Sequence, residues 1–377
     1  MRALSLATVL VLAAGAVGCG RNDAGGENVI VVGEYGSRTG ATATFGISSN
    51  EGVTLALEQI NAAGGVLGKK IKLISEDDQS KADEAVNAVQ KLINKDEVVA
   101  IIGEVASKRS LAGGNVCQKY KVPMLSPAST NPQVTKIGDY VFRSCYTDDF
   151  QGGTCGRFAV KQGWKRVAVL TDIANDYSKG LAARFKEVYA PAGQIVADES
   201  FREGDKDFKP QLTTIKNATP DAVFLPGYYT DIGNILTQAR GLGLAVPFFG
   251  GDGWDSEQTL KLGPIADGCF YSNHYSPDDP RSQVQDFVKA YRARFNDKMP
   301  DAMATLGYDA AYVLADAIKR AGKADRQAIR DALAATRNFP GVSGSITIDE
   351  NRNARKPIVI LRIQGGKTQL VDSILPQ

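Results

Sequence analysis

The sequence predicts an α/β protein of two units, each a doubly wound parallel sheet with helices on its faces. From Val29 onward, short apolar runs typical of buried strands alternate with longer amphipathic runs typical of helices. The same alternation restarts beyond Asp148. The chain has 377 residues, more than one hydrophobic core usually serves, so two domains are the expected number.

The first unit opens with a predicted strand at 29–33. The helix after it ends at Gly64-Gly65, and its apolar face is formed by Val53, Ala56, Leu57 and Ile60. A second helix is expected to open at Ser80, which has capping-box spacing to Asp83. The remaining elements of this unit are strands at 71–75, 98–103, 122–125 and 140–144 and a helix at 107–120.

The second unit repeats the pattern with helices and strands of similar length. Its predicted helices are 150–162, 178–189, 208–216 and 231–240, and its strands are 166–171, 195–200, 222–225, 247–249 and 269–272. The long helices at 283–295, 304–320 and 326–335 fit either unit. The chain ends in strands at 345–349 and 357–363, and Gly365-Gly366 is interpreted as a hairpin turn.

The amino terminus predicts an exported protein. Residues 4–17 are almost wholly apolar, a length that suits a signal peptide better than a membrane span. The small residues before Cys19 resemble a bacterial lipobox, which predicts a signal peptide at 1–18 and lipidation of Cys19. An ordinary secretory signal with a chance cysteine is the alternative. The polar, Gly-rich residues up to 27 are interpreted as a tether between the lipid and the folded body.

Charge and cysteine content limit the partners. Without residues 1–18 the chain has 43 basic and 42 acidic side chains, a balance that does not favour nucleic-acid binding. Four cysteines then remain: Cys117, Cys145, Cys155 and Cys269. An exported protein can form disulfides, and four cysteines allow three complete pairings, so disulfides and free buried thiols are both open. Their spacing matches no metal site.

Groups that could carry out catalysis are scarce. His274 is the single histidine, and no serine elbow of the form G-x-S-x-G lies near it, so a hydrolase triad is not expected. We interpret His274 as structural, and Asp77-Asp78 as turn formers rather than metal ligands. The sequence therefore predicts a binding protein without cofactor or metal.

Two loops of the first unit predict the binding site. The apolar runs ending near Ser107 and Thr130 deliver small hydroxyl residues to the carboxyl edge of the predicted sheet. Backbone N–H groups and short hydroxyls there can share one negative charge, so we expect a small carboxylate to bind. In the alternative interpretation the hydroxyls merely cap helices.

The second unit offers aromatic and acidic residues at matching positions. Tyr177, Tyr228 and Asp252 each follow the end of a predicted strand. If this edge faces the first, the cleft has a carboxylate-binding wall and an aromatic, acidic wall, which complement a zwitterion. Each tyrosine taken singly could instead pack against its own loop.

Several local runs are shared with a known family. They are residues 40–46, 58–68, 126–132, 142–143, 151–152, 227–229 and 307–310. The most specific are Asn-Ala-Ala-Gly-Gly at 61–65 and Ser-Pro-x-x-Thr-Asn-Pro at 126–132. Over almost its whole mature length, the chain resembles the Leu/Ile/Val-binding type of periplasmic binding proteins of branched-chain amino-acid ABC transporters. The resemblance implies two α/β lobes joined by three crossovers, at 28–146 with 275–347 and at 147–274 with 348–377.

The resemblance also implies a role for each site residue. The ligand carboxylate would be held by Ser107, Ala128 and Thr130, with Ser129 contributing its backbone. Asp252, assisted by Tyr228, would pair with the ligand ammonium. The ligand side chain would be surrounded by Phe45, Val105 and Tyr177.

Departures from the family pattern leave the ligand side chain open. A disulfide of the family corresponds to Ser80 and Ala106 and is absent, Asp252 replaces a longer glutamate, and Phe45 replaces a tryptophan. Related proteins bind amides, urea or aromatic acids. We expect a monomeric, lipid-anchored receptor in the cell envelope that delivers a small aliphatic amino acid to a membrane permease. A ligand sensor of a signalling system is the alternative from another class, and an enzyme is the least favoured.

Overall fold

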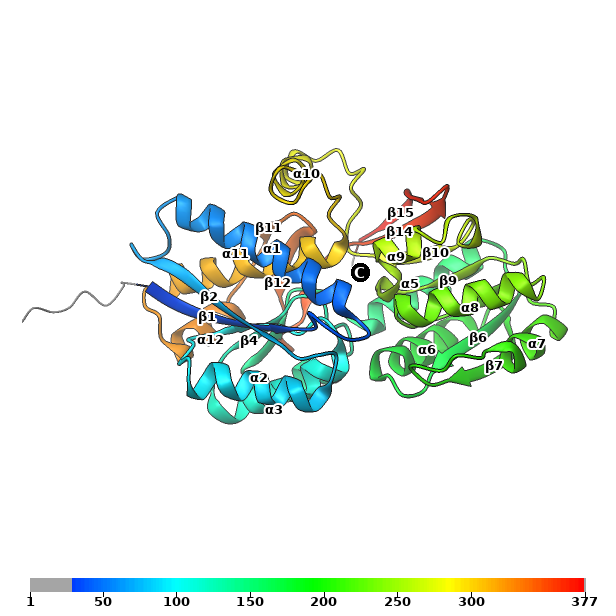
Figure 1. Ribbon diagram of the computed structural model, residues 1–377, viewed down its shortest axis with the longest axis horizontal. Coiled ribbons are helices and arrows are strands. Elements are labelled where there is room, and N and C mark those ends of the chain that lie inside the picture. The colour runs from blue at the N-terminus through cyan, green and yellow to red at the C-terminus, as the bar shows by residue number, and fades with distance from the viewer. Residues whose placement is uncertain (1–28, 376–377) are drawn as a thin grey trace, which may run out of the picture.

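A computed structural model describes residues 29–375, which form two parallel-sheet units side by side (Figure 1). The predicted signal peptide, Cys19 and the tether to residue 27 lie outside the described residues. None of the helices within 29–375 is long and apolar enough to cross a membrane.

The first sheet has five strands, and every neighbouring pair is parallel. Their order is β2 (Lys70–Asp77), β1 (Val29–Gly36), β3 (Ile101–Ile102), β4 (Met124–Ser126) and β5 (Val141–Arg143). One face is covered by α1 (Ala43–Ala62), α11 (Ala302–Ala321) and α12 (Arg326–Ala334). The other face is covered by α2 (Ala82–Asn94), α3 (Ser107–Tyr120) and the short α4 (Gln133–Lys136). Figure 1 shows the two helix layers above and below the sheet.

The second sheet repeats this strand order and then extends it. Its seven strands are β15 (Lys367–Ile374), β14 (Ile358–Gln364), β10 (Phe270–Asn273), β9 (Phe248–Gly250), β8 (Ala222–Phe224), β6 (Arg166–Asp172) and β7 (Gln194–Phe201). One face is covered by α5 (Asp148–Lys161) and α6 (Asp176–Tyr189), the other by α7 (Lys209–Asn217) and α8 (Tyr229–Gly241). Short helical turns follow β9: η1 (Asp252–Trp254), α9 (Glu257–Leu260) and η2 (Gly263–Ile265).

The last two strands depart from the predicted parallel arrangement. β14 and β15 pair antiparallel, and β14 is also antiparallel to β10. The turn predicted at Gly365-Gly366 is confirmed, because it joins Gln364 to its partner Lys367. A two-residue turn can connect only antiparallel strands, so the hairpin fixes this orientation.

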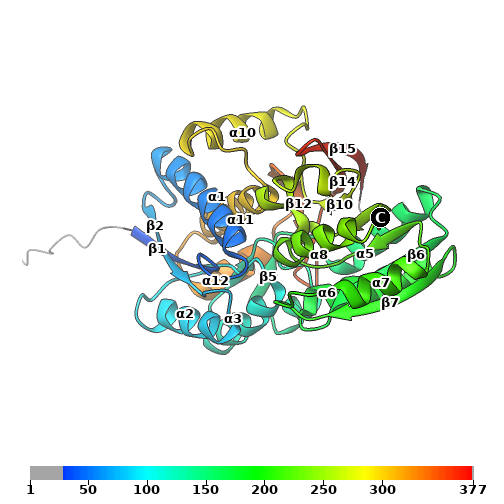
Figure 2. The same cartoon turned by 45° about the vertical axis from the view of Figure 1, so that its right-hand side comes forward.

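The long helices that fitted either unit lie with the first sheet. α11 crosses α1 so closely that a side chain at Gly52 would have its Cβ 1.9 Å from the Ala304 carbonyl oxygen. α10 (Ser282–Arg294) packs beside them, as Figure 2 shows. A small antiparallel sheet of β11 (Phe339–Gly341), β12 (Gly344–Ile348) and β13 (Ala354–Arg355) follows.

We propose lobe limits close to those expected from the sequence. The strands of the first sheet fall within 28–146, and those of the second fall within 147–274 and 348–377. The predicted limit at 348 would divide the small sheet, because Ile348 pairs with Ala354. We therefore place the third crossover after Arg355.

Local details correct two expectations. The predicted strand at 98–103 is only Ile101–Ile102, since the chain turns away at Gly103, whose φ of 133° favours glycine. The capping box at Ser80 does not form, because Lys81 is the N-cap of α2 and the Ser80 hydroxyl donates to the carbonyl of Thr39. All four remaining cysteines are buried, free thiols.

Candidate functional site

The first wall of the site is formed where β3 and β4 end. Parallel pairing sets Ile102 beside Leu125, so the loops that follow leave the sheet at the same edge. Ser107 is the first residue of α3, and no side chain caps this helix. Its hydroxyl oxygen accepts a hydrogen bond from the N–H of Asn131 at 3.2 Å, which joins the two loops. The Ser107 O–H and the helix N-terminus are thus arranged to meet an anion.

The second wall comes from three loops of the other sheet. Tyr177 lies in the first turn of α6, Tyr228 is the N-cap of α8, and Asp252 follows β9. The rings of Tyr177 and Tyr228 stack at 5.3 Å with 8° between their planes. The N–H of Gly253 donates to the Tyr177 hydroxyl at 3.2 Å, which fixes the ring against the Asp252 loop.

The two walls close on a narrow pocket whose cavity volume is only about 10 Å³. Its lining is Phe45, Val105, Ser107, Ala128, Thr130, Tyr177, Tyr228, Asp252, Gly253 and Met303. The structure therefore brings together eight of the nine residues expected at the site. A cavity of this size has room for about one water molecule, so the two walls almost fill the space between them.

The walls are in contact across the pocket, so the structure represents a closed arrangement. The Phe45 ring on α1 meets the ring of Tyr228 edge-on at 5.6 Å and that of Tyr229 at 4.9 Å. The Tyr229 hydroxyl donates to the carbonyl of Ala41 at 3.1 Å. Nδ2 of Asn131 donates to the carbonyl of Asp176 at 2.7 Å.

Ser129 lies behind the first wall and does not line the pocket. Its N–H donates to Ser126 Oγ at 2.9 Å, and its carbonyl accepts from Arg143 Nη1. Its own hydroxyl lies 2.9 Å from the carbonyl oxygen of Glu104. Because both backbone polar groups of Ser129 already bond to other residues of the protein, Ser129 supports the ligand loop and does not contact the ligand.

Asp252 is a buried carboxylate that only neutral groups contact. It is 3 % exposed. Oδ1 accepts from Gln151 Nε2 at 2.9 Å, and Oδ2 lies 2.9 Å from His274 Nε2. No lysine or arginine within residues 29–375 forms an ion pair with it, so the pocket wall carries an uncompensated negative charge.

His274 acts as a neutral donor to Asp252. Burial lowers the pKa of His274 to about 4, although the hydrogen bond and the charge of Asp252 act in the opposite direction. The ring is therefore neutral at pH 7, and Nε2 must carry the proton to donate to the carboxylate. The ring also stacks on Tyr146 at 3.8 Å, which holds it in place.

A second carboxyl group, Asp148, lies close to this site. It is buried, and neither carboxyl oxygen has a hydrogen-bond partner within the described part of the chain. Burial raises the pKa of Asp148 well above its ordinary value, and the charge of Asp252 raises it further. Burial and the neighbouring carboxylate therefore both favour the protonated form of Asp148.

Comparison with known proteins decides the family. The model of a family described as periplasmic binding protein matches residues 29–368. The chain belongs to this periplasmic binding protein family. A leucine-, isoleucine-, valine-, threonine- and alanine-binding protein of Pseudomonas aeruginosa is 32 % identical over 321 residues, which cover 84 % of each chain.

Solved structures agree with this periplasmic binding protein fold. A leucine-binding protein LivK of Thermotoga maritima is 39 % identical, with a TM-score of 0.88 and coverage of 92 % of this chain and 99 % of that one. The branched-chain amino-acid substrate-binding protein LivJ of Streptococcus pneumoniae, in complex with isoleucine, is 34 % identical. Its TM-score is 0.88, and 92 % of this chain and 100 % of that one are covered. Family membership implies a periplasmic location and a receptor for solutes.

Four residues of this periplasmic binding protein's site were not foreseen from the sequence. Gln151 and His274 hold Asp252, and Gly253 and Met303 line the pocket. Gln151 belongs to a run shared with the family, and His274 stands out as the single histidine, but neither signal indicates a contact with Asp252. Met303 carries no signal in the sequence.

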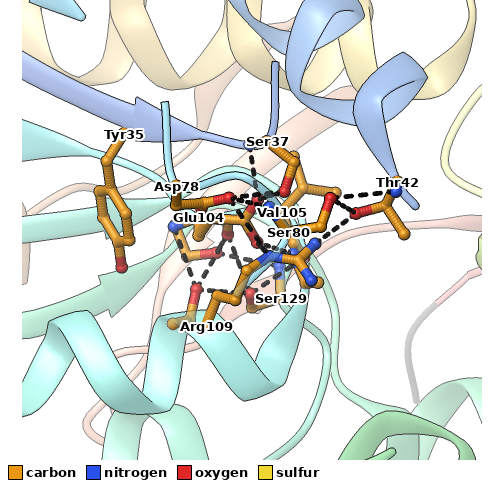
Figure 3. Close-up of polar contacts among 12 residues, drawn as sticks. Tyr35, Ser37, Thr42, Asp78, Ser80, Glu104, Val105, Arg109 and Ser129 are labelled. Carbon is orange, nitrogen blue, oxygen red and sulfur yellow. Dashed lines mark hydrogen bonds and ion pairs between the residues drawn. The ribbon is translucent and has the colours of Figure 1, made fainter. Parts of the chain in front are cut away.

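A buried charge cluster lies directly behind the first wall of this binding protein (Figure 3). Arg109 Nε is 3.2 Å from Glu104 Oε2 and 3.7 Å from Asp78 Oδ1, and Nη2 donates to Thr42 Oγ1 at 2.7 Å. Ser37 Oγ donates to Asp78 Oδ1 at 2.7 Å. The cluster fixes the segment from Glu104 that leads into the ligand loop.

The structure confirms the interpretation of Asp77-Asp78 as turn formers and adds a second role for Asp78. Asp77 does form the turn, because its carboxylate accepts from the N–H groups of Arg38 and Gln79. Asp78 also forms the turn, because its Oδ1 accepts from the N–H of Ser80 at 3.0 Å, and it is fully buried within the charge cluster. Burial, together with the charge of Glu104, raises the pKa of Asp78 to about 7, although Arg109 acts against this shift.

Proposed function

We propose that this protein is the solute-binding receptor of an ABC importer and captures a small aliphatic amino acid between its two lobes. The uncompensated charge of Asp252 is the observation that carries the proposal. A buried carboxylate with only neutral donors is costly, and an ammonium group in the pocket would offset that cost. Each oxygen still has a free lone pair beyond its bond to Gln151 or His274.

The opposite wall supports binding of a carboxylate. The hydroxyls of Ser107 and Thr130, together with the N-terminus of α3, provide neutral donors there. Among the described residues, no lysine or arginine lines the pocket. An α-amino acid would therefore meet donors at its carboxylate and Asp252 at its ammonium.

The apolar lining favours an aliphatic side chain. Phe45, Val105 and Met303 present carbon surface to the pocket, which suits an apolar side chain. The relatives, which are named for binding leucine, isoleucine, valine, threonine or alanine, support the same class. Phe45 and Met303 are the side chains that we expect to set the size limit.

The mechanism is capture by lobe closure. The first lobe would bind the carboxylate, and closure would bring Asp252, Tyr177 and Tyr228 over the ligand. Contacts such as that between Phe45 and Tyr229 would then stabilise the closed form. We propose that this form docks as a monomer on a membrane permease, and that Cys19 carries the lipid that retains the receptor at the membrane.

A thermal-shift screen of residues 21–377 tests the ligand class. Leucine, isoleucine, valine and alanine are each compared with acetamide, urea and benzoate at equal concentration. A ligand that binds only the folded protein stabilises it by about 2.7 kcal/mol at a hundredfold excess over Kd. We expect shifts with aliphatic amino acids alone. Shifts confined to the amides, urea or benzoate would contradict the ammonium role of Asp252, and no shift with any of them would contradict the proposed ligand class.

A further inference from the structure

A second, larger hollow lies away from the ligand pocket. Its cavity volume is about 520 Å³, and it shares no lining residue with the ligand pocket. Its walls come from α4 on the first sheet, from α5 and α6 on the second, and from residues 349–356. Both lobes and two of the connecting segments therefore contribute to it. We call it the basic hollow.

The basic hollow carries a strong excess of positive charge. Its basic side chains are Lys136, Arg157, Arg184, Arg352, Arg355 and Lys356. Two carboxylates, Asp149 and Asp349, also line it, which leaves an excess of four positive charges. Within residues 29–375, only one of the six cations, Arg184, forms an ion pair, with Glu187 outside the hollow at 2.7 Å. The unpaired cations repel one another across a concave wall, which concentrates positive potential there.

The two carboxylates do little to balance this charge. Oδ1 of Asp349 already accepts hydrogen bonds at 2.9 Å from the N–H groups of Asn351 and Asn353, so it serves the local turn. Asp149 is exposed at the entrance of α5. In the described part of the chain, neither lies within ion-pair distance of a basic side chain of the hollow.

Donor groups at the base of the hollow are buried. Lys356 is 1 % exposed, and its ammonium donates to Ser343 Oγ and is attracted by the buried Asp309, neither of which lines the hollow. Arg352 donates through Nη2 to the carbonyl of Thr135 at 2.8 Å, but its buried Nε has no acceptor among the described residues. A buried N–H without an acceptor is unusual in a folded protein, so this donor is free to bind an anion. Burial lowers the pKa of Lys356 to about 8, a shift that a bound anion would reverse.

We propose that the basic hollow is a second binding site, for a small multivalent oxyanion of the phosphate or diphosphate class. Guanidinium groups match the oxygens of such anions in pairs, and four arginines line the hollow. A monovalent anion would offset only a quarter of the excess charge. Because both lobes supply cations, the bound anion bridges them in the closed arrangement.

Bridging couples the two sites of the protein. An anion that binds the closed arrangement more tightly than the open one raises the affinity of the cleft for the amino acid. The amino acid in turn raises the affinity for the anion by the same factor, since linkage is reciprocal. This coupling rests on the proposed function, whereas anion binding does not.

Isothermal titration of residues 21–377 with sodium diphosphate, and separately with phosphate, tests the site without amino acid present. Ionic strength is matched with sodium chloride. We expect saturable binding of one diphosphate, and weaker binding of phosphate. The variant Arg157→Gln should weaken diphosphate binding about tenfold, and Arg157→Gln with Arg352→Gln should weaken it further.

The matched control removes two exposed cations elsewhere, Lys206→Gln with Lys289→Gln, and changes net charge by the same amount. Binding should stay as in the natural protein. Heats that do not saturate, or equal weakening in the control pair, would overturn the proposed site. The side chain of Arg157 donates a hydrogen bond to the nearby Thr154 Oγ1 and joins no ion pair within residues 29–375, so the single variant should fold, and its melting curve verifies this. A leucine titration with and without diphosphate then measures the coupling separately.

Discussion

Nε2 of His274 and Oδ2 of Asp252 lie 2.9 Å apart, and both side chains are buried. The histidine is the single one in the chain, and it follows β10, whereas Asp252 follows β9. Since β9 and β10 are adjacent and parallel, their carboxyl ends bring the two residues together. The neutral side chains of Gln151 and His274 thus hold the Asp252 carboxylate in place without neutralising it, so it can pair with a cationic ligand.

Asp252→Asn should abolish most of the amino-acid affinity without harming the fold. Truncating one partner of a buried charge pair typically costs about 2–5 kcal/mol of binding, so we expect Kd to rise at least about thirtyfold. The unfolding free energy of the ligand-free protein should stay the same or increase, because an unpaired buried charge is removed. Calorimetric titration and urea unfolding measure the two quantities. Unchanged affinity would contradict the ammonium role.

His274→Phe should weaken binding by about tenfold, because Asp252 loses one of its two fixed donors while the stacking on Tyr146 is kept. His274→Gln restores an N–H donor and should recover most of the affinity. Both variants are titrated with the same amino acid. If they weaken binding equally, His274 does not act through the hydrogen bond to Asp252.

Thr130→Val should lower ligand affinity, whereas Ser129→Ala should lower the stability of the protein, because only Thr130 lines the pocket. Thr130 lines the pocket, so loss of its hydroxyl should raise Kd about tenfold or more with little change in stability. Ser129 lies behind the wall, where its hydroxyl is 2.7 Å from that of Ser110. Its removal should lower the unfolding free energy by about 1–3 kcal/mol. Titration and urea unfolding of both variants test this, and the reverse pattern would be inconsistent with the placement of the two residues.

Asp78 should make the protein less stable as the pH rises from about 4 to about 7. Its pKa is raised to about 7 by burial first and by Glu104 second, so the folded protein keeps a proton that the unfolded chain releases. Stability is therefore full below the unfolded pKa and falls by up to about 1.4 kcal/mol per pH unit through this window. Asp231 and Asp301 also have raised pKa values, of about 6 and about 7, and contribute to the same pH dependence. Comparison with the Asp78→Asn variant therefore isolates the part of this pH dependence that Asp78 causes.

Urea unfolding of both proteins at several pH values supplies that comparison. The amide of the Asp78→Asn variant cannot titrate, so the difference in unfolding free energy between the two proteins should change across the window and level off above about pH 7. A difference that stays constant from about pH 4 to about pH 8 would show that Asp78 is ionised in the same way in the folded and unfolded states.

Local pattern was sufficient for most of the secondary structure and for much of the site. The helix predicted at 107–120 is α3 as observed, and the apolar face of α1, from Val53 to Ile60, is buried. Such patterns report which residues face a core, and they depend only on neighbours in sequence. Loops after parallel strands of one sheet share an edge, so Ser107 and Thr130 could be placed together from the sequence, whereas a cleft with Asp252 was expected only if the edges of the two sheets face each other.

The sequence by itself determined the α/β class, the order of elements and the strand ends that bear the site, because periodicity and turn residues are local signals. Only the tertiary structure decided which side chains meet. Gln151 and Asp252, which form a hydrogen bond, are separated by 101 positions. Asp78 follows β2 and Glu104 follows β3, and both carboxylates contact Arg109. These contacts follow from sheet register and helix packing, which no local pattern specifies. The same packing set α11 on the first sheet and created the basic hollow between the lobes.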